Sequence, residues 1–191
     1  MYAFQKKKTQ RMSILEPGER APAPDFLGTT AQRAGVWADG SCLFHALAAA
    51  AARGRSQPRA AGLALRKSIY DRATPRRYAQ AMRAYGVPEE GRLGFRAFKK
   101  KLRAGASDMH TIPYIMYDLD INVLFAENHG FYCGVQYFHP ERRNVIIYWY
   151  KEHFEPIGGI MPASSTAMLK SLYSRCRMGF YRRLLLMAQE Q

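Results

Sequence analysis

The chain has 191 residues, a formal net charge of +14, and 48% hydrophobic and 13% aromatic residues. This length suits one domain with tails, and the apolar content excludes a chain that is disordered throughout. Its three cysteines, Cys42, Cys133 and Cys176, are odd in number and widely spaced, which argues against a disulfide framework and favours a reducing intracellular compartment, cytoplasm or nucleus.

The N-terminal residues 1–33 lack apolar periodicity and carry lysines, prolines and glycines. We therefore predict a flexible basic arm here. It has no seven-residue apolar block and no small-residue cleavage site, so it is not a secretory signal. No run of 18 apolar residues occurs either, so no transmembrane segment is expected.

A helix is expected to follow, because Ser41 can cap it, a run of alanines continues it and Gly54 can end it. Further helical patterns cover 62–73, 75–85, 93–104 and 107–118, where apolar residues recur at steps of three and four.

The positive charge is concentrated on these helices. Residues 53–103 hold 15 Lys and Arg against 3 Asp and Glu, whereas residues 104–160 hold 3 against 7. Solvated outer helix faces are the commoner reason for such charge, and nucleic acid is the candidate partner that it suggests.

The second half of the chain changes to strand-like patterns. The run 121–125 is typical of a buried strand, and 131–138 with 144–150 predicts a hairpin whose second strand is central in its sheet. Residues 164–188 then predict an amphipathic C-terminal helix. The order indicates an α+β fold with an N-terminal helical lobe, a small mainly antiparallel sheet and an added C-terminal helix.

One cysteine and one histidine stand out as a candidate catalytic pair. Cys42 falls in the first turn of a predicted helix, where backbone N–H groups and the helix dipole lower a thiol's pKa. Gly40 and Ser41 precede it, in a loop that can direct N–H groups at an oxyanion. His153, just beyond the predicted central strand, is the candidate base.

Two carboxylates are candidates to orient that base. Glu155 follows His153 by two residues, and Asp39 precedes the cysteine by three. The sequence leaves open which of them acts. His45, one helical turn after Cys42, is fixed on the same helix as the nucleophile and is expected to pack rather than to shuttle protons.

Two blocks resemble the ovarian-tumour-type (OTU) cysteine proteases. "DGSCLFHAL" at 39–47 resembles the start of that family's catalytic helix, and "HFEPI" at 153–157 resembles its second block. Between them, "SDMHTIPYIMYDLDINVLF" is similar to the family's helix and core strand. The resemblance covers 34–160, so the chain divides into an arm (1–33), an OTU-like catalytic domain (34–160) and a C-terminal helix (161–191).

The resemblance implies a papain-like deubiquitinase, a thiol isopeptidase that removes ubiquitin or a ubiquitin-like modifier from lysine without a metal or cofactor. Cys42 would be the nucleophile, His153 the general base and then acid, and Glu155 the orienting residue. The family more often has Asp or Asn at this last position, so Asp39 remains an alternative. The loop with Gly40 and Ser41 would form the oxyanion hole. A single compact domain of this kind would suit a viral protein or a bacterial effector acting in a host cell.

The acidic segment 104–160 complements ubiquitin's basic C-terminal tail. Asp108, Glu127 and Glu141 are its candidate substrate contacts. His129, Cys133 and His139 supply only three zinc-type ligands on a strand and its turns, so no metal is predicted. Two alternatives to an active enzyme remain on the same fold: a basic nucleic-acid-binding protein and a catalytically inactive ubiquitin-binding protein.

Overall fold

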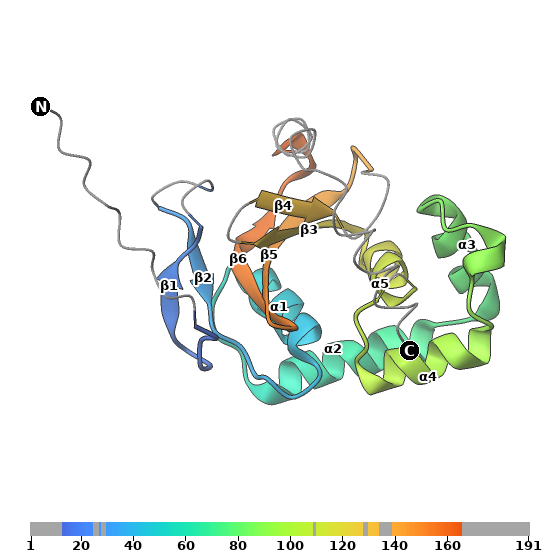
Figure 1. Ribbon diagram of the computed structural model, residues 1–191, viewed down its shortest axis with the longest axis horizontal. Helices are drawn as coiled ribbons and strands as arrows, with labels where there is room; N and C mark the ends of the chain where they lie inside the picture. Colours follow the sequence, from blue (N-terminus) through green and yellow to red (C-terminus); the bar gives the residue numbers. More distant parts are fainter. Residues whose placement is uncertain are drawn as a thin grey trace, which may run out of the picture.

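A sheet with α1 lies at one end of the structure, and the other helices extend away from it (Figure 1). The computed structural model describes residues 13–24, 27, 30–108, 110–127, 130–133 (backbone only) and 139–165. The helices are α1 (Cys42–Ala51), α2 (Arg59–Arg72), α3 (Pro75–Ala84), α4 (Phe95–Ala104) and α5 (Thr111–Leu119), with short 3-10 turns η2 (Glu89–Gly91) and η3 (Ala163–Ser165). These five helices of the described residues were all predicted, and their presence is confirmed.

Within the described residues, six strands form one mixed sheet in the order β1-β2-β6-β5-β3-β4. They are β1 (Arg20–Pro22), β2 (Gln32–Ala34), β3 (Ile121–Glu127), β4 (Gly130–Cys133), β5 (Arg143–Tyr150) and β6 (His153–Met161). Strands β3 and β5 pair in parallel, and the other four pairs are antiparallel. The α+β class is thus confirmed. The prediction that 144–150 forms a central strand is confirmed as well, because β5, which contains these residues, lies between β6 and β3.

The predicted hairpin of 131–138 with 144–150 is wrong. Strand β4 pairs with β3, and β5 lies on the other side of β3. The long, buried β5 instead pairs with β6 through a turn at 151–152, although no strand was expected after residue 150. The polar residues between 138 and 144 correctly predicted a turn. Composition does not specify, however, which strand pairs with β5. Residues 134–138 lie outside the described part.

The prediction of a flexible arm is also wrong for the described residues between 13 and 33. Here β1 and β2 pair with each other, and β2 joins the sheet where Arg33 lies opposite Ile157 of β6. The segment packs closely, because a Cβ built on Gly35 would lie 2.0 Å from the carbonyl oxygen of Glu16. Proline is compatible with a strand here, because Pro22 ends β1, the strand at the edge of the sheet. Residues 1–12 are outside the described part.

Apolar side chains pack on both faces of the sheet. The larger core lies between the sheet and the helices and includes Phe44, Phe125 and Phe154. A smaller cluster on the opposite face includes Tyr148 and Ile157. The described helices include none that is long and apolar enough to cross a membrane. Of the predicted C-terminal helix, only 164 and 165 are described, and they lie in η3.

Candidate active site

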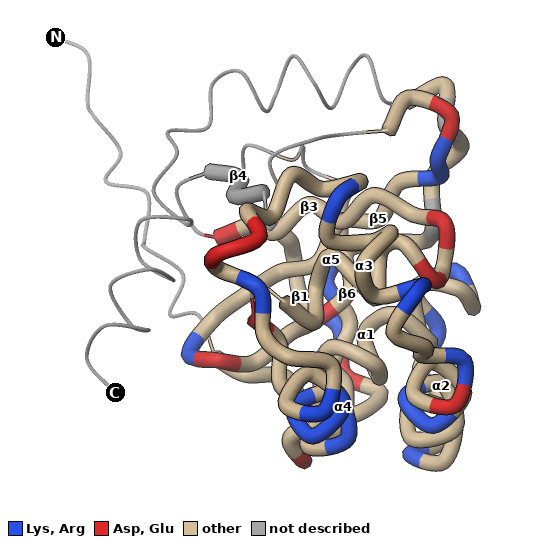
Figure 2. Tube along the Cα trace, turned by 90° about the vertical axis from the view of Figure 1, so that its right-hand side faces the viewer, with Lys and Arg blue, Asp and Glu red and all other residues tan. Residues whose placement is uncertain are grey.

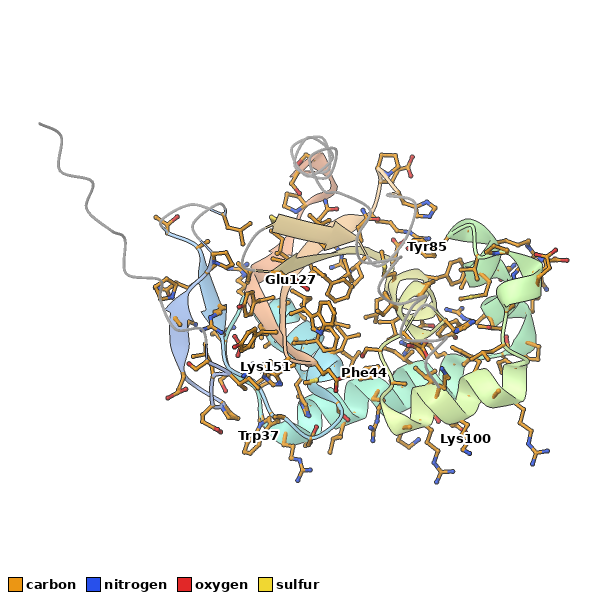
Figure 3. All side chains as sticks on the ribbon, viewed as in Figure 1. Trp37, Phe44, Tyr85, Lys100, Glu127 and Lys151 are labelled. Carbon is orange, nitrogen blue, oxygen red and sulfur yellow. The ribbon has the colours of Figure 1, made fainter. Side chains whose placement is uncertain are left out.

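The thiol of Cys42 lies against the turn that joins β5 to β6. Cys42 is the first residue of α1, and its S–H donates to the carbonyl oxygen of Glu152 at 3.7 Å. Lys151, labelled in Figure 3, and Glu152 have φ of 48° and 62°, the left-handed geometry of a tight hairpin turn. His153 is the next residue and begins β6. The fold therefore brings the cysteine to the residue preceding the predicted base.

His153 is buried, with Glu155 beside it on the same strand. Its Nε2 lies 3.8 Å from Oε1 of Glu155, beyond hydrogen-bond distance, and has no hydrogen-bond partner among the described residues. Residues two apart in a strand share a face. Burial, supported by the charge of Arg33, lowers the pKa of His153. The imidazole is therefore neutral at neutral pH, the form that can accept a proton.

Both carboxylate oxygens of Glu155 are held by groups from the N-terminal segment. The backbone N–H of Leu15 donates to Oε1 at 2.7 Å, and Nη1 of Arg33 donates to Oε2 at 2.9 Å. Burial raises the pKa of Glu155, and these two donors oppose that rise. Sequence reasoning missed Leu15 and Arg33, because one is a backbone contact and the other is one of many arginines in a segment that resembles a loose arm.

Asp39 is committed to its own loop rather than to His153. Its Oδ1 accepts from the backbone N–H of Ser41 at 3.1 Å and lies 3.0 Å from Nε2 of His45, while Oδ2 accepts from Nε of Arg59 at 2.6 Å. Burial by itself would raise the pKa of Asp39, but Arg59 and His45 outweigh it and the pKa is lowered. His45 therefore braces the loop before α1.

The loop before α1 is fixed from two further directions. Gly40 has φ of +74°, and a Cβ built on Gly105 would lie 2.1 Å from its carbonyl oxygen. Ser41 occupies the predicted N-cap position but makes no capping bond; its Oγ accepts from Nη1 of Arg66 at 2.7 Å. The end of α4 and the side of α2 thus set the backbone position of the predicted oxyanion loop.

Burial raises the pKa of the Cys42 thiol. The backbone N–H groups of Phe154, Leu43 and Cys42 itself favour the thiolate, whereas the charge of Asp39 opposes it. The sequence-based expectation of a lowered pKa at a helix start is therefore not met, because loss of water around the sulfur outweighs the helix N-terminus. Burial thus raises the pKa of the Cys42 thiol and lowers that of the His153 imidazole, so in both groups it favours the neutral form.

The three predicted substrate contacts lie in different places. Asp108 accepts from Lys101 at 2.6 Å and from the backbone N–H of Thr111 at 3.0 Å, so it serves the start of α5. Glu127 ends β3, at the same end of the sheet as His153, because β3 and β5 run in parallel. Glu141 is exposed in the turn before β5, at the opposite end. Of the three, Glu127 alone shares the sheet end of the site.

No metal centre is formed by the described residues, among which no group of three or more His, Cys, Asp and Glu could hold an ion. The side chains of His129 and Cys133 are outside this description. His139 packs edge-on against Tyr85, with ring centroids 5.1 Å apart.

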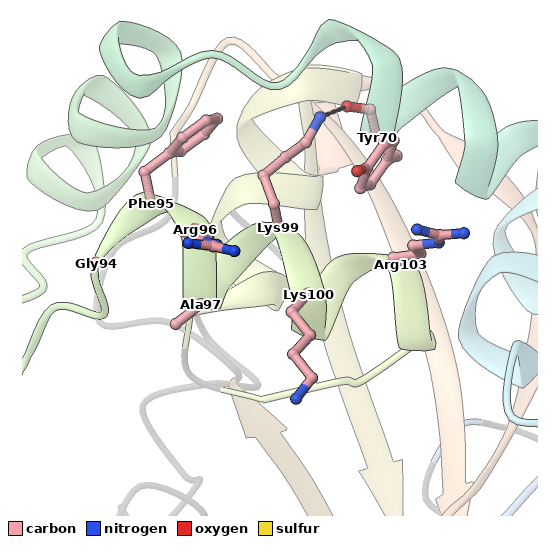
Figure 4. A pocket seen from close by; sticks show the side chains of 8 residues that line it. All are labelled: Tyr70, Gly94, Phe95, Arg96, Ala97, Lys99, Lys100 and Arg103. Atoms are coloured by element: carbon pink, nitrogen blue, oxygen red, sulfur yellow. Dashed lines mark hydrogen bonds between the residues drawn. The ribbon is translucent and has the colours of Figure 1, made fainter.

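A second feature, the basic groove, lies along α4 and reaches Tyr70 on α2 (Figure 4). Its volume is about 770 Å³, and it is lined by Tyr70, Gly94, Phe95, Arg96, Ala97, Lys99, Lys100 and Arg103. The ammonium of Lys99 lies 3.5 Å from the centre of the Tyr70 ring. Figure 2 shows Lys and Arg gathered on both helices. Cationic and aromatic side chains therefore share one surface.

Comparison with protein-family models and with curated proteins finds no match for this chain. The roles predicted for Cys42, His153 and Glu155 accordingly depend on their chemistry, on their arrangement and on the resemblance of two short motifs.

Proposed function

We propose that this protein is a papain-like thiol isopeptidase of the OTU type, which removes ubiquitin or a ubiquitin-like modifier from lysine. The observation that carries the proposal is the meeting of Cys42, at the start of a helix, with the turn that leads into His153. A nucleophile on one element and a base on another allow the base to move a proton between the thiol and a leaving group.

In the proposed reaction, His153 takes the thiol proton as the Cys42 sulfur attacks the carbonyl carbon of the modifier's C-terminal glycine. Backbone N–H groups at the start of α1 donate to the oxyanion of the tetrahedral intermediate. Its collapse breaks the C–N bond, and the imidazolium gives its proton to the departing lysine amine. Water, deprotonated by His153, then attacks the thioester, and the modifier leaves as a carboxylate while the thiol is restored.

Glu155 has a supporting part in this scheme. Its Oε1 is the carboxylate oxygen 3.8 Å from Nε2 of His153, so a small rotation of the ring would let Nε2–H donate to it. Such a bond keeps the other ring nitrogen, Nδ1, free to exchange protons and supports the imidazolium when it forms. We assign the orienting role to Glu155 because both oxygens of Asp39 already serve His45, Ser41 and Arg59.

The test is labelling by ubiquitin that carries a C-terminal electrophile. Wild-type protein should form a covalent adduct of increased mass, and Cys42→Ala should form none. Cys133→Ala and Cys176→Ala are matched controls that should label at the wild-type rate. Absence of wild-type labelling by probes of ubiquitin and ubiquitin-like modifiers, together with no cleavage of any di-ubiquitin, contradicts the enzyme. Ubiquitin binding without labelling supports the inactive binding protein instead.

A second candidate function is single-stranded nucleic-acid binding, favoured by the basic groove. Arg96, Lys100 and Arg103 line it and can contact phosphates, and the partly buried rings of Tyr70 and Phe95 line it as well (Figure 4). This function would be independent of Cys42, and both could exist in one molecule.

Nucleic-acid binding predicts a steep dependence on salt. The affinity for a fluorescent single-stranded RNA, measured by anisotropy, should fall linearly in log–log form with salt, because each neutralised phosphate releases counterions. Changing Arg96, Lys100 and Arg103 together to Glu should weaken binding by about tenfold or more at low salt. The exposed Arg55→Glu, outside the groove, is the control. No binding, or a flat salt response, contradicts this function.

A further inference from the structure

A buried ion pair between Arg33 and Glu155 lies next to His153, the candidate base. The side chains of Arg33 and Glu155 are 3% and 2% exposed, and Nη1 and Oε2 are 2.9 Å apart. A buried carboxylate and guanidinium lose most of their hydration, so a pair of this kind is weak evidence for stability alone. Its position beside His153 calls for another explanation.

We propose that Arg33 is a positioning residue of the active site, which together with the backbone N–H of Leu15 holds the carboxylate of Glu155 toward His153. The proposal rests on the proposed function, and it makes β2 and the segment before β1 working parts of the site. The sequence offered no such role for residues 13–33.

The contacts of Arg33 fix its guanidinium as well as its charge. Nη1 also donates to the carbonyl oxygen of Ser13 at 2.8 Å, and the guanidinium lies 4.9 Å from the centre of the Tyr148 ring. Tyr148 is paired with Glu155 across β5 and β6. A planar, stacked cation held in this way positions its partner more rigidly than a lysine ammonium would.

Leu15 contributes through its backbone and is independent of side-chain chemistry. Its N–H reaches Oε1 of Glu155, the same oxygen that lies 3.8 Å from Nε2 of His153. With Arg33 on the other oxygen, the carboxylate has little freedom to turn away. Glu155 has one methylene more than an aspartate, and its carboxylate is held by Leu15 and Arg33, two residues outside the predicted catalytic domain 34–160.

Arg33 also acts on the charge state of the base. Its positive charge adds to burial in lowering the pKa of His153. Other charged or titratable groups around His153 and Glu155 come from several elements: Tyr148 and Tyr150 on β5, Lys151 and Glu152 in the hairpin turn, Glu19 before β1, and Cys42 on α1, whose thiol contacts the carbonyl of Glu152. Loss of Arg33 should therefore raise the pKa of His153, whereas loss of the Glu155 charge should lower it.

The first experiment is a double-mutant cycle on probe labelling. Arg33→Met and Glu155→Gln should each slow labelling by about 10²-fold, since small displacements of a catalytic group cost that much. If Arg33 acts through Glu155, the double variant should be no slower than Glu155→Gln. Arg20→Met, on the neighbouring β1, is the matched control, because Arg20 donates to the carbonyl of Gly54 and not to Glu155.

The second experiment needs no modifier. Titration of the His153 ring by NMR, in the Cys42→Ala background, should show a higher pKa in Arg33→Met and a lower one in Glu155→Gln. Thermal unfolding identifies any variant that fails to fold. The double variant removes both charges of the buried pair, so neither is left unpaired, and His153 can be titrated in it even if a single variant unfolds. The proposal is overturned if Arg33→Met labels at the wild-type rate, or if the losses of rate in the two single variants add in the double variant. It is also overturned if the pKa of His153 is unchanged in Arg33→Met. If no probe of ubiquitin or of a ubiquitin-like modifier labels the wild-type protein, the proposed function fails. The titration of His153 still decides whether Arg33 has the positioning role.

Discussion

We expect His153→Gln to lower the turnover of a fluorogenic ubiquitin C-terminal amide by about 10³-fold, at the centre of the range for loss of a general acid–base group. Glutamine keeps a polar side chain but cannot exchange a proton. Other described histidines cannot substitute, because Nε2 of His45 is bound to Asp39 and Nε2 of His110 to the carbonyl of Gly91. The measurement is kcat/KM, with the melting temperature recorded for each variant.

The matched control is His139→Gln. His139 lies before β5, at the end of the sheet away from Cys42, and its backbone N–H donates to Asn122. This variant should retain kcat/KM within about threefold, the range of an uncoupled site. Turnover by folded His153→Gln within tenfold of wild type would remove His153 from the mechanism.

Gly105→Ala is expected to disable both the fold and the site. Gly105 has φ of +82°, where a side chain costs about 1–2 kcal/mol. The added Cβ would also lie 2.1 Å from the backbone oxygen of Gly40, a contact that flexible side chains cannot relieve. With overpacking of about 1–3 kcal/mol, the free energy of unfolding should fall by about 2–5 kcal/mol. Urea denaturation measures this loss.

The same substitution should displace the loop before Cys42. In the fraction that still folds, probe labelling should slow by about 10²-fold, because the oxyanion donors and the thiol move together. Gly91→Ala is the control, since a Cβ there meets nothing within 4 Å and its φ is not left-handed. Equal stability of the two variants would show that the contact between Gly105 and Gly40 is not a constraint.

Local patterns predicted the helices well. Ser41 and the alanine run predicted the position of α1, although Ser41 makes no capping bond, and the apolar residues on both faces of β5 predicted a buried strand. These features depend on residues close in sequence, which is why a single chain reveals them. The candidates Cys42 and His153 were found in the same way, as residues at the ends of such elements.

Pairing across long separations was not predictable. Strands β1 and β2 have three residues each, too few for a period of two to appear. The partner of β4 depends on which edge of β3 is vacant, a property of the folded sheet. Arg33 and Leu15 reach Glu155 from 122 and 140 residues away, and one of these contacts involves only backbone. The raised thiol pKa likewise depends on tertiary burial.

The hairpin turn at Lys151 and Glu152 has a consequence for how the chain can vary. Successive residues of β6 point to opposite faces, with Phe154 in the large core between His153 and Glu155. A slip of one residue in the pairing of β5 with β6 would bring all three side chains to the wrong face. The number of residues in this turn is therefore as strict a requirement as the identity of the histidine: if one residue were removed between Tyr150 and His153 and the two-residue turn kept, Phe154 would pair with Tyr150 in the position of the candidate base.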